Sequence, residues 1–518
     1  MEGEPVGDDD DVDDDDASDD DDVTDDDDDV TDDDTADDDD VTDDDDDVAD
    51  DDDDDDDDTV TLYTCQECHT SKAAIKADIA RRPSDHVVEG GGGGCGGAIS
   101  RFEPSQAVFV NQTFLSSMHG SQSCVSCHGG VEPAANRDDA HTGDFVVYAA
   151  NEKNCGGCHK KDMEKYPLSL HAKFNGLTPE DEEFVKRAAA HVRRVSDDKE
   201  AQKLMAQGIE QGCAECHRTT CGACHITLPK PSGGGFPNTG HVFYSPPNVV
   251  YNCTACHGGR KAKEFLVSGV DQPSLDNCDL GTLEELKQDV HYNPGEMSCE
   301  ACHPYDWMHA PKEDMTKKLR YENEALPKCE ECHVEGNENQ FFENSYHATH
   351  AQGKGAAAYL SCQVCHSQPY PNCISCHLKP GEEGEPPADY KFFTLKIAKN
   401  PFQTSYYAEN IPRLQERYTY DYTLVRRPSI VPDTFDGFGK DILSNYTKYS
   451  TWKYATPHNI QLQTMQTKNG CEGCHNEKKF YLTREYLQNL MTPEHFGEKA
   501  GLFLEKELEA NSEILMEK

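Results

Sequence analysis

The chain has 518 residues and a formal net charge of −53, and this charge is concentrated at one end. Residues 1–58 hold 38 Asp and 2 Glu with no Lys or Arg, which is −40 of the −53, so residues 59–518 carry only −13. Mean hydropathy is −0.80 and only 35% of residues are hydrophobic. No apolar run approaches the roughly 20 residues that a membrane-spanning helix needs. The composition therefore excludes a helical membrane protein and predicts that something other than aliphatic side chains fills the interior.

The acidic segment, residues 1–58, has almost nothing apolar to bury and repels itself, so we predict a disordered, extended tether. Val-Thr or Val-Ala pairs interrupt its blocks of Asp. Calcium binding is the alternative, because carboxylates are suitable oxygen ligands, although the segment lacks the glycine-punctuated spacing of a fixed site.

The remaining chain is dominated by one motif, Cys-x-x-Cys-His, which uses 22 of the 24 cysteines. It occurs eleven times, at Cys65, Cys68 and His69; Cys124, Cys127 and His128; Cys155, Cys158 and His159; Cys213, Cys216 and His217; Cys221, Cys224 and His225; Cys253, Cys256 and His257; Cys299, Cys302 and His303; Cys329, Cys332 and His333; Cys362, Cys365 and His366; Cys373, Cys376 and His377; and Cys471, Cys474 and His475.

This spacing predicts covalent attachment of haem c at each motif, about 11 haems in all. The two cysteines can form thioethers to the two vinyl groups of one porphyrin, and the adjacent histidine then supplies an axial nitrogen to the iron. Structural zinc and a disulfide framework are the alternatives, and neither accounts for a histidine after every second cysteine. The two remaining cysteines, Cys95 and Cys278, could form a disulfide in an oxidising compartment or stay free.

Twelve further histidines are candidates for the second axial position of the eleven irons. Near equality of the two numbers predicts mostly bis-histidine haems, which are coordinatively saturated and therefore suited to passing electrons rather than binding substrate. His347 and His350 lie three residues apart and could serve two haems or compete for one. We predict as ligands His119, His141, His171, His191, His241, His291, His309, His347, His350 and His458; the other two candidates are His86, the weakest by context, and His495.

Residues 59–380 carry ten motifs, about one per 32 residues, which is too little chain for a separate fold around each porphyrin. We therefore predict a ten-haem stack that serves as the core, clothed in short helices and loops. Motifs that start only eight or eleven residues apart, at Cys213 and Cys221 and at Cys362 and Cys373, should hold porphyrins in near contact. The fold class is mainly α with much irregular structure, a multihaem cytochrome c stack.

One helix is predicted over residues 178–211. Thr178-Pro179-Glu180-Asp181 is typical of a helix start, with an N-cap, Pro at the first turn and acidic residues. Apolar residues follow at helical spacing, which should turn His191 towards a packed face.

Residues 381–470 contain no haem motif and are rich in Tyr and Phe. Alternation over 418–425 predicts a strand. We expect this segment to cover part of the stack with its aromatic rings, and a docking surface is the alternative. Residues 471–518 hold the eleventh motif and an amphipathic helix that is predicted over 493–517.

The predicted haems place the mature protein in the periplasm or on the cell surface, where haem is attached to such motifs. The printed start, Met1-Glu-Gly-Glu-Pro, lacks the features of a signal peptide, so we expect an export signal upstream or already removed. The acidic segment after such a signal would suit a lipid or outer-membrane tether.

The middle of the chain, about residues 110–480, resembles the octahaem cytochromes related to hydroxylamine oxidoreductase and octahaem tetrathionate reductase. The resemblance rests on the double motif from Cys213 to His225, the segment from Asp289 through His303 to His309, the closing pair from Cys362 to Cys373, and Thr456-Pro-His458-Asn. It implies a mostly helical haem stack. The chain has eleven motifs rather than eight and no Cys-x-x-Cys-Lys, so no catalytic residue is transferred.

Taken together, the sequence predicts an electron carrier that passes electrons between redox partner proteins, such as other cytochromes or a quinol-linked membrane donor, with no nucleic-acid role. The alternative is an oxidoreductase acting on nitrite, hydroxylamine or tetrathionate at one open haem. A repeating subunit of a cytochrome filament is a further reading that overlaps the first.

Overall fold

The computed structural model describes residues 60–81, 108–146, 149–217, 220–226, 241–253, 257, 289–292, 295–333, 345–350, 359–368, 395–427 and 430–516. The chain divides into two units, residues 1–59 and residues 60–518. The predicted tether therefore lies outside the described residues, as do Cys95, Cys278 and His86. All the described residues belong to the second unit.

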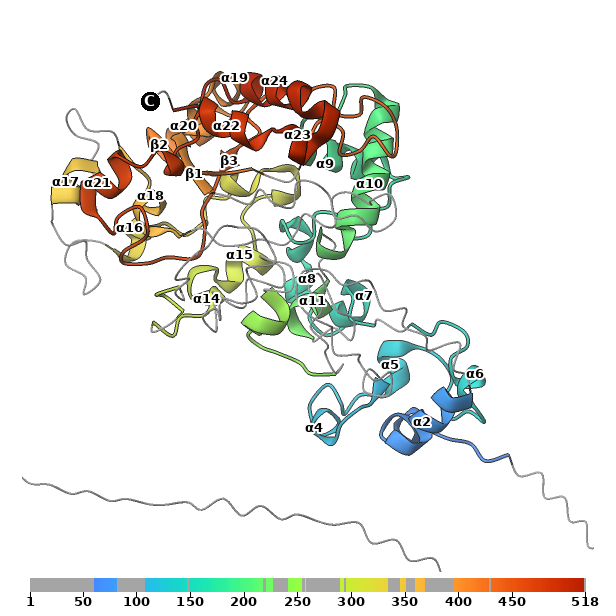
Figure 1. Cartoon of the computed structure of the whole chain (residues 1–518). Helices are drawn as coiled ribbons and strands as arrows, with labels where there is room; N and C mark the ends of the chain where they lie inside the picture. Colours follow the sequence, from blue (N-terminus) through green and yellow to red (C-terminus); the bar gives the residue numbers. More distant parts are fainter. Residues whose placement is uncertain are drawn as a thin grey trace, which may run out of the picture. The chain divides into compact units, whose positions relative to one another are not determined.

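Most described motifs fold as single helical turns (Figure 1). Residues such as Thr64 and Asn151 cap these turns by accepting a hydrogen bond from a backbone N–H of the first turn. The turns at or across the motifs are α1 (Cys65–His69), α5 (Cys124–His128), α7 (Glu152–Gly156), α11 (Cys221–His225), α14 (Cys299–Cys302), α16 (Cys329–Cys332), α18 (Cys362–His366) and α21 (Gly470–His475).

The other elements of the motif-bearing part are short as well. Between the motifs lie α2 (Lys72–Arg81), α4 (Gln112–Leu115), α6 (Arg137–Ala140), α8 (Lys160–Met163), the π-helical turn η3 (Val249–Cys253), α15 (Tyr305–His309) and α17 (Ser345–His350). Single 3₁₀ turns are η2 (Tyr166–Leu168), η7 (Met315–Lys317) and η8 (Arg320–Glu322).

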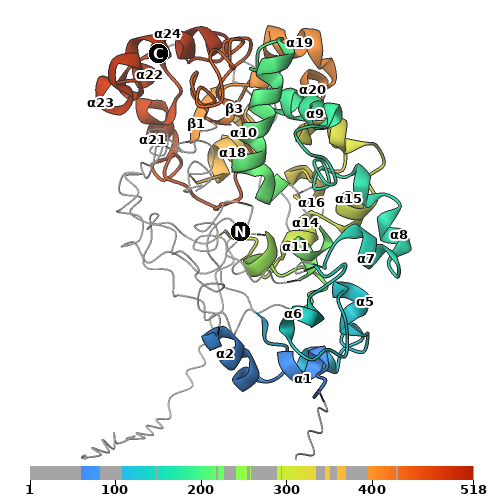
Figure 2. The ribbon, with the colours of Figure 1, turned by 90° about the vertical axis from the view of Figure 1, so that its right-hand side faces the viewer.

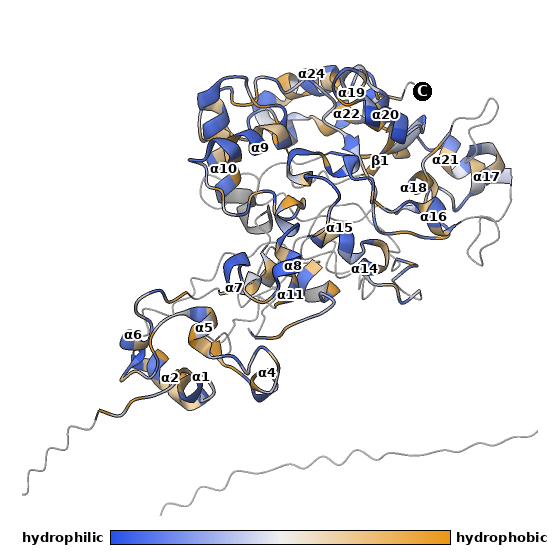
Figure 3. Ribbon diagram, turned by 180° about the vertical axis from the view of Figure 1, so that it is seen from behind, coloured by the Kyte–Doolittle hydropathy of each residue, from blue (hydrophilic) through white to orange (hydrophobic). Residues whose placement is uncertain are grey.

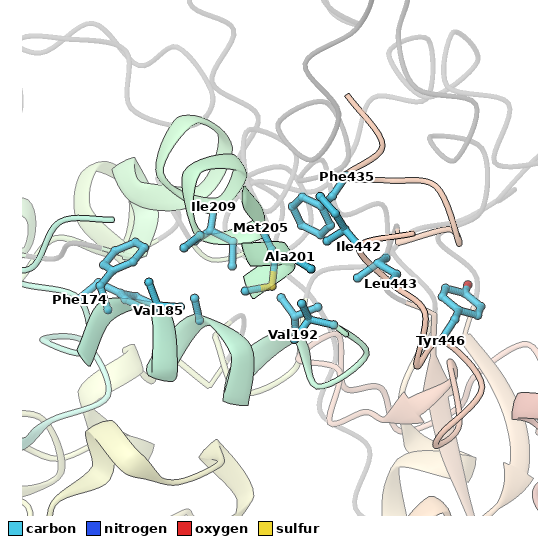
Figure 4. Close-up of a cluster of buried hydrophobic side chains, with 14 residues drawn as sticks. Phe174, Val185, Val192, Ala201, Met205, Ile209, Phe435, Ile442, Leu443 and Tyr446 are labelled. Carbon is cyan, nitrogen blue, oxygen red and sulfur yellow. The ribbon is translucent and has the colours of Figure 1, made fainter. Parts of the chain in front are cut away.

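Two longer helices, α9 (Glu182–Val192) and α10 (Lys199–His217), pack against each other and against residues 435–446 (Figure 4). Phe184, Ala188 and Met205 are fully buried in this cluster. Arg194, also buried, donates to the carbonyl oxygens of Tyr446 and Ser450. The α9–α10 pair is thereby fixed to the C-terminal third of the chain.

The C-terminal third has a three-stranded antiparallel sheet, in the order β1 (Leu395–Lys399), β2 (Tyr422–Arg426), β3 (Lys453–Tyr454). In both Figure 1 and Figure 2 the last helices gather beside this sheet. The remaining elements are η11 (Pro401–Gln403), α19 (Ser405–Asn410), α20 (Pro412–Arg417), η12 (Lys478–Phe480), α22 (Arg484–Leu490), α23 (Pro493–Phe496), η13 (Gly497–Lys499) and α24 (Ala500–Ala510).

Three predicted elements differ from the structure in their limits. The helix expected over 178–211 is divided, because Arg193 adopts a left-handed conformation (φ 60°) that ends α9, and the N-cap is Asp181 rather than Thr178. The prediction that His191 faces a packed side stays a prediction, because its exposure is shared by paired histidines such as His119 and His159. The predicted strand begins only at Tyr422, and the C-terminal helix is broken at η13 and ends at Ala510.

Hydrophobic and hydrophilic residues are interspersed along the described ribbon (Figure 3), but the buried hydrophobic side chains are unevenly distributed. The buried clusters lie in α9–α10 and in residues 395–516, whereas the motif-bearing segments contribute few buried hydrophobic side chains, such as Ile75, Ala134 and Val364. Among the helices that the structure describes, none is long and apolar enough to cross a membrane.

Candidate functional site

In the candidate site, one helical turn presents the side chains of each motif. Cysteines three residues apart lie on one face of the turn, and the histidine follows at its end. In α1, Thr64 and Glu67 form a reciprocal capping box that fixes where the turn starts. The structure describes the side chains of 17 motif cysteines, and none of these 17 forms a disulfide. Each such turn therefore offers two thiols and an imidazole to one side.

The structure brings nine motif histidines opposite nine other histidines. Every pair contains one histidine of each kind, although the partners come from distant parts of the sequence. With the motif histidine first, the pairs are His69–His141, His159–His119, His128–His241, His257–His171, His225–His309, His333–His291, His303–His458, His366–His347 and His475–His350.

The ring centroids of these pairs are 5.8–6.2 Å apart. This spacing is too wide for direct stacking: His119 on Phe243 and His141 on Phe145 have centroid distances of 4.1 and 4.2 Å. Two metal–imidazole bonds of about 2.0 Å on opposite sides of one metal ion place the ring centres roughly 6 Å apart. The pairs thus have the separation of two axial ligands of one iron.

Hydrogen bonds on the far side of the rings fix several motif imidazoles. Nδ1 lies 2.9 Å from the carbonyl oxygen of Val108 in His69, and 2.8 Å from that of Tyr244 in His225. His128 and His366 make equivalent contacts with main-chain carbonyls at 2.9 and 3.0 Å. A carbonyl can only accept, so Nδ1 carries the proton and Nε2 keeps its lone pair for a metal.

Burial favours the neutral form, which is the form that binds a metal, in several of these imidazoles. Desolvation by the surrounding protein lowers the pKa of His241 and of His458 to about 4, even though both rings retain accessible surface. The same effect lowers the pKa of His303 below its ordinary value. These imidazoles could therefore bind a metal without first losing a proton at neutral pH.

Contacts between motifs connect the pairs into a series. The Sγ atoms of Cys155 and Cys221 lie within hydrogen-bonding reach, and so do those of Cys253 and Cys299. The same holds for Cys65 with Cys124 and for Cys329 with Cys362. In each case the first cysteine of one motif meets the first cysteine of another.

The remaining links join these couples. Asn154 of the third motif donates to the carbonyl oxygen of Cys127 at 2.7 Å, and Asn252 beside the sixth motif donates to the carbonyl oxygen of Ala223 at 3.1 Å. Cys302 lies near enough to Cys332 for their charges to interact, and the same is true of Cys365 and Cys474. Numbered along the chain, motifs 1, 2, 3, 5, 6, 7, 8, 9 and 11 follow one another in space.

α17 settles one question that the sequence left open. His347 and His350 face two different motif histidines, His366 and His475, so one helical turn serves two motifs.

Two motif histidines are not in these pairs, because the side chain of His217 and the whole motif at His377 lie outside the described residues. The same is true of Cys213, Cys216, Cys256, Cys373 and Cys376, and of the His495 side chain. Three non-motif histidines, His86, His191 and His495, remain for those two positions. Within the described ranges no group of three or more His, Cys, Asp or Glu is arranged to hold a metal ion by itself.

Sequence reasoning missed the pairing and the residues beside it. Trp307 lies against both His171 and His303, at centroid distances of 5.9 and 4.7 Å, and so stands between two pairs. Asp289 lies against His291. Asp289 stands two residues before His291, a candidate ligand, and this was the only signal in the sequence for Asp289 or Trp307.

Comparison with known proteins does not assign the chain to a family. No protein-family model, no curated protein and no solved structure matches this chain. The resemblance to octahaem cytochromes therefore stays a prediction from the quoted residues.

Proposed function

We propose that this protein is an extracytoplasmic multihaem c-type cytochrome that relays electrons between redox partners through about eleven mostly bis-histidine haems. The observation that carries the proposal is the set of nine one-to-one histidine pairs with centroids 5.8–6.2 Å apart. Each pair lies beside a motif whose cysteines suit thioether attachment.

The chain's own residues suit haem. The motif cysteines would anchor the porphyrin edge, the motif histidine would bind one face of the iron, and the paired histidine would bind the other. Haem supplies the one-electron Fe(III)/Fe(II) couple. Carbonyl acceptors such as those of Val108 and Tyr244 hold the imidazoles in the ligating tautomer.

Saturated coordination favours relay over catalysis. An iron with two imidazoles has no open position, so a substrate can bind only by displacing a ligand, whereas an electron can still enter and leave. The contacts between motifs support a continuous route for electrons. Where the cysteines of two motifs lie within hydrogen-bonding reach, the porphyrin edges attached to them would also lie close together. Nine of the proposed haems would form this route, in the spatial order given above.

A second candidate is an oxidoreductase acting on a small nitrogen or sulfur compound at one open haem. The observation that keeps it is the histidine count: nine of the twelve non-motif histidines are paired, and His217 and His377 would have to draw on the other three, His86, His191 and His495. A high-spin ferric signal equal to one haem per chain would favour this function.

The location and partners follow from the haem proposal. Attachment outside the cytoplasm implies a periplasmic or cell-surface protein, and the acidic residues 1–58 suit a tether to lipid or the outer membrane. Other cytochromes or a quinol-linked donor are the proposed partners.

The test uses purified protein from a host that attaches haem c. We expect an intact mass that includes about eleven haems, and an EPR spectrum of the ferric protein that is almost entirely low-spin. His141→Ala should convert one haem to high-spin, because it removes the partner of His69. Thr142→Ala, which removes only a bond to the carbonyl of Asp139, is the matched control and should leave the spectrum unchanged. A mass without porphyrin would refute the proposal, and an unchanged spectrum in His141→Ala would refute this pairing.

A further inference from the structure

Asp289 is a buried carboxylate, only 5% exposed, beside the histidine pair of the eighth motif. Its Oδ1 accepts hydrogen bonds from the backbone N–H groups of His291 at 2.9 Å and Tyr292 at 3.3 Å. The same oxygen lies 3.4 Å from Nδ1 of His291. Within the described part of the chain no Lys or Arg forms an ion pair with Asp289, so its charge is compensated by these N–H groups and by the His291 ring.

Asp289 also connects two ligand segments that are far apart in the sequence. Its Oδ2 accepts from the backbone N–H of Ile460 at 2.7 Å, and the Val290 N–H donates to the Ile460 carbonyl at 3.0 Å. Ile460 lies two residues after His458, the partner of His303. One carboxylate therefore contacts the segments that carry the second imidazoles of motifs 7 and 8.

The neighbouring pair offers a contrast. Nδ1 of His303 is buried and makes no hydrogen bond to any residue that the structure describes. His69 and His225 face uncharged carbonyl oxygens instead. The ring of His291 therefore differs from these in having a full negative charge at Nδ1.

A carboxylate at Nδ1 makes an imidazole a stronger electron donor to a metal on Nε2. A buried negative charge close to the iron also favours Fe(III), whose charge is higher, over Fe(II). Both effects act in the same direction and lower the reduction potential.

We propose that Asp289 is a positioning residue that holds the reduction potential of the haem at Cys329–His333 low, acting through His291. The inference rests on the proposed function, since it requires a haem between His291 and His333. It creates a potential step inside the series, between motif 7, where Nδ1 of His303 has no hydrogen-bond partner among the described residues, and motif 8.

The test is a redox titration of the holoprotein, followed by absorbance and by low-spin EPR. Asp289→Asn keeps the size of the side chain and removes the charge, so one one-electron wave should move to higher potential, with a smaller upward movement of the wave of motif 7. Asp289→Ser, which keeps an oxygen near the His291 N–H, should move the same wave in the same direction and guards against misfolding of the first variant.

Asp162→Asn is the matched control. Asp162 lies 3.7 Å from Nδ1 of His159, but it is more exposed and accepts a hydrogen bond from the Tyr305 hydroxyl. Its titration should follow that of the unaltered protein closely. Curves that coincide for Asp289→Asn, Asp289→Ser and the unaltered protein, at full haem content, would overturn the role of Asp289 alone. An equal shift in Asp162→Asn would overturn it too, whereas absence of haem would instead refute the proposed function.

Discussion

Residues 395–516 and the motif-bearing segments within 60–366 fill their interiors in different ways. Residues 395–516 completely bury apolar and aromatic side chains such as Ile442, Trp452 and Leu482. The motif-bearing segments bury few, yet seven of the nine histidine pairs lie wholly within them, and the other two pairs draw His458 and His475 from the C-terminal part. Residues 395–516 therefore have a core of their own side chains, whereas the motif-bearing segments are organised around imidazoles that face each other across about 6 Å.

The largest expected effect comes from producing the chain without haem attachment. A region with few buried hydrophobic side chains cannot offset the conformational entropy of folding, so motif segments such as 60–81 and 108–146 should lose their structure. Residues 395–516 and α9–α10 should keep theirs. Hydrogen exchange read by mass spectrometry would show protection in the second set alone. Equal protection of both regions would erase the comparison.

Arg427→Met tests the strongest polar contact of the C-terminal region. Arg427 lies 3.3 Å from Glu507, and both side chains are buried. The substitution leaves Glu507 without its charge partner and should cost about 3–5 kcal/mol of unfolding free energy in that region. Denaturant unfolding followed by hydrogen exchange measures the loss. The double variant Arg427→Met with Glu507→Gln should recover part of the stability, and no recovery would argue against the charge explanation.

Leu482→Ala tests the apolar core itself. Leu482 is fully buried, and its N–H donates to the Ile397 carbonyl of β1. Removing three carbons there should cost about 2–5 kcal/mol. Leu462→Ala, at a position that is 85% exposed, is the matched control and should change stability little. The haem absorbance of both proteins should be the same, and a selective loss of haem in Leu482→Ala would mean that the two regions share one core.

Much of the site could be predicted from the sequence, because Cys-x-x-Cys-His is a local motif whose chemistry needs only consecutive residues. The pairing could not. His303 meets His458 from 155 residues away, and the route between them depends on turns and loops that no periodicity encodes. Asp289 stands in a segment that the sequence singled out, but its role could not be predicted, since it depends on a backbone N–H at Ile460.

The fold was predictable where side-chain spacing is strong and uncertain at the ends of elements. The apolar spacing of Phe184, Ala188 and Val192 predicts α9, and all three are buried. The break at Arg193 was missed because a left-handed arginine has no sequence signal of its own. The strand was placed too early because Tyr418 and Tyr420 alternate like a strand but belong to an aromatic cluster with Tyr321 and Phe402.

The smallest expected effect is a pH dependence of the stability of the C-terminal core. Lys396 in β1 is buried, its Nζ donates to the Lys479 carbonyl at 2.5 Å and lies 3.9 Å from the centre of the Tyr486 ring, and desolvation lowers its pKa from 10.5 to about 8. Between pH 8 and 10.5 the unfolded chain therefore binds more protons than the folded one, so stability should fall as the pH is lowered through this window and level off below pH 8.

The total change is at most about 3 kcal/mol. Lys396→Met should remove its own share of this slope, leaving the share of Lys453, whose pKa desolvation also lowers, and should raise the stability at pH 7, because the cost of burying this charge disappears while the stem still packs. Lys399→Met, at the exposed end of the same strand, is the matched control and should keep the slope. Unfolding by urea at pH 7, 8, 9 and 10 measures it in all three proteins. If the slope is unchanged in Lys396→Met, Lys396 does not contribute to it. The comparison of the two regions would then lose its electrostatic evidence, and the apolar evidence from Leu482 would remain.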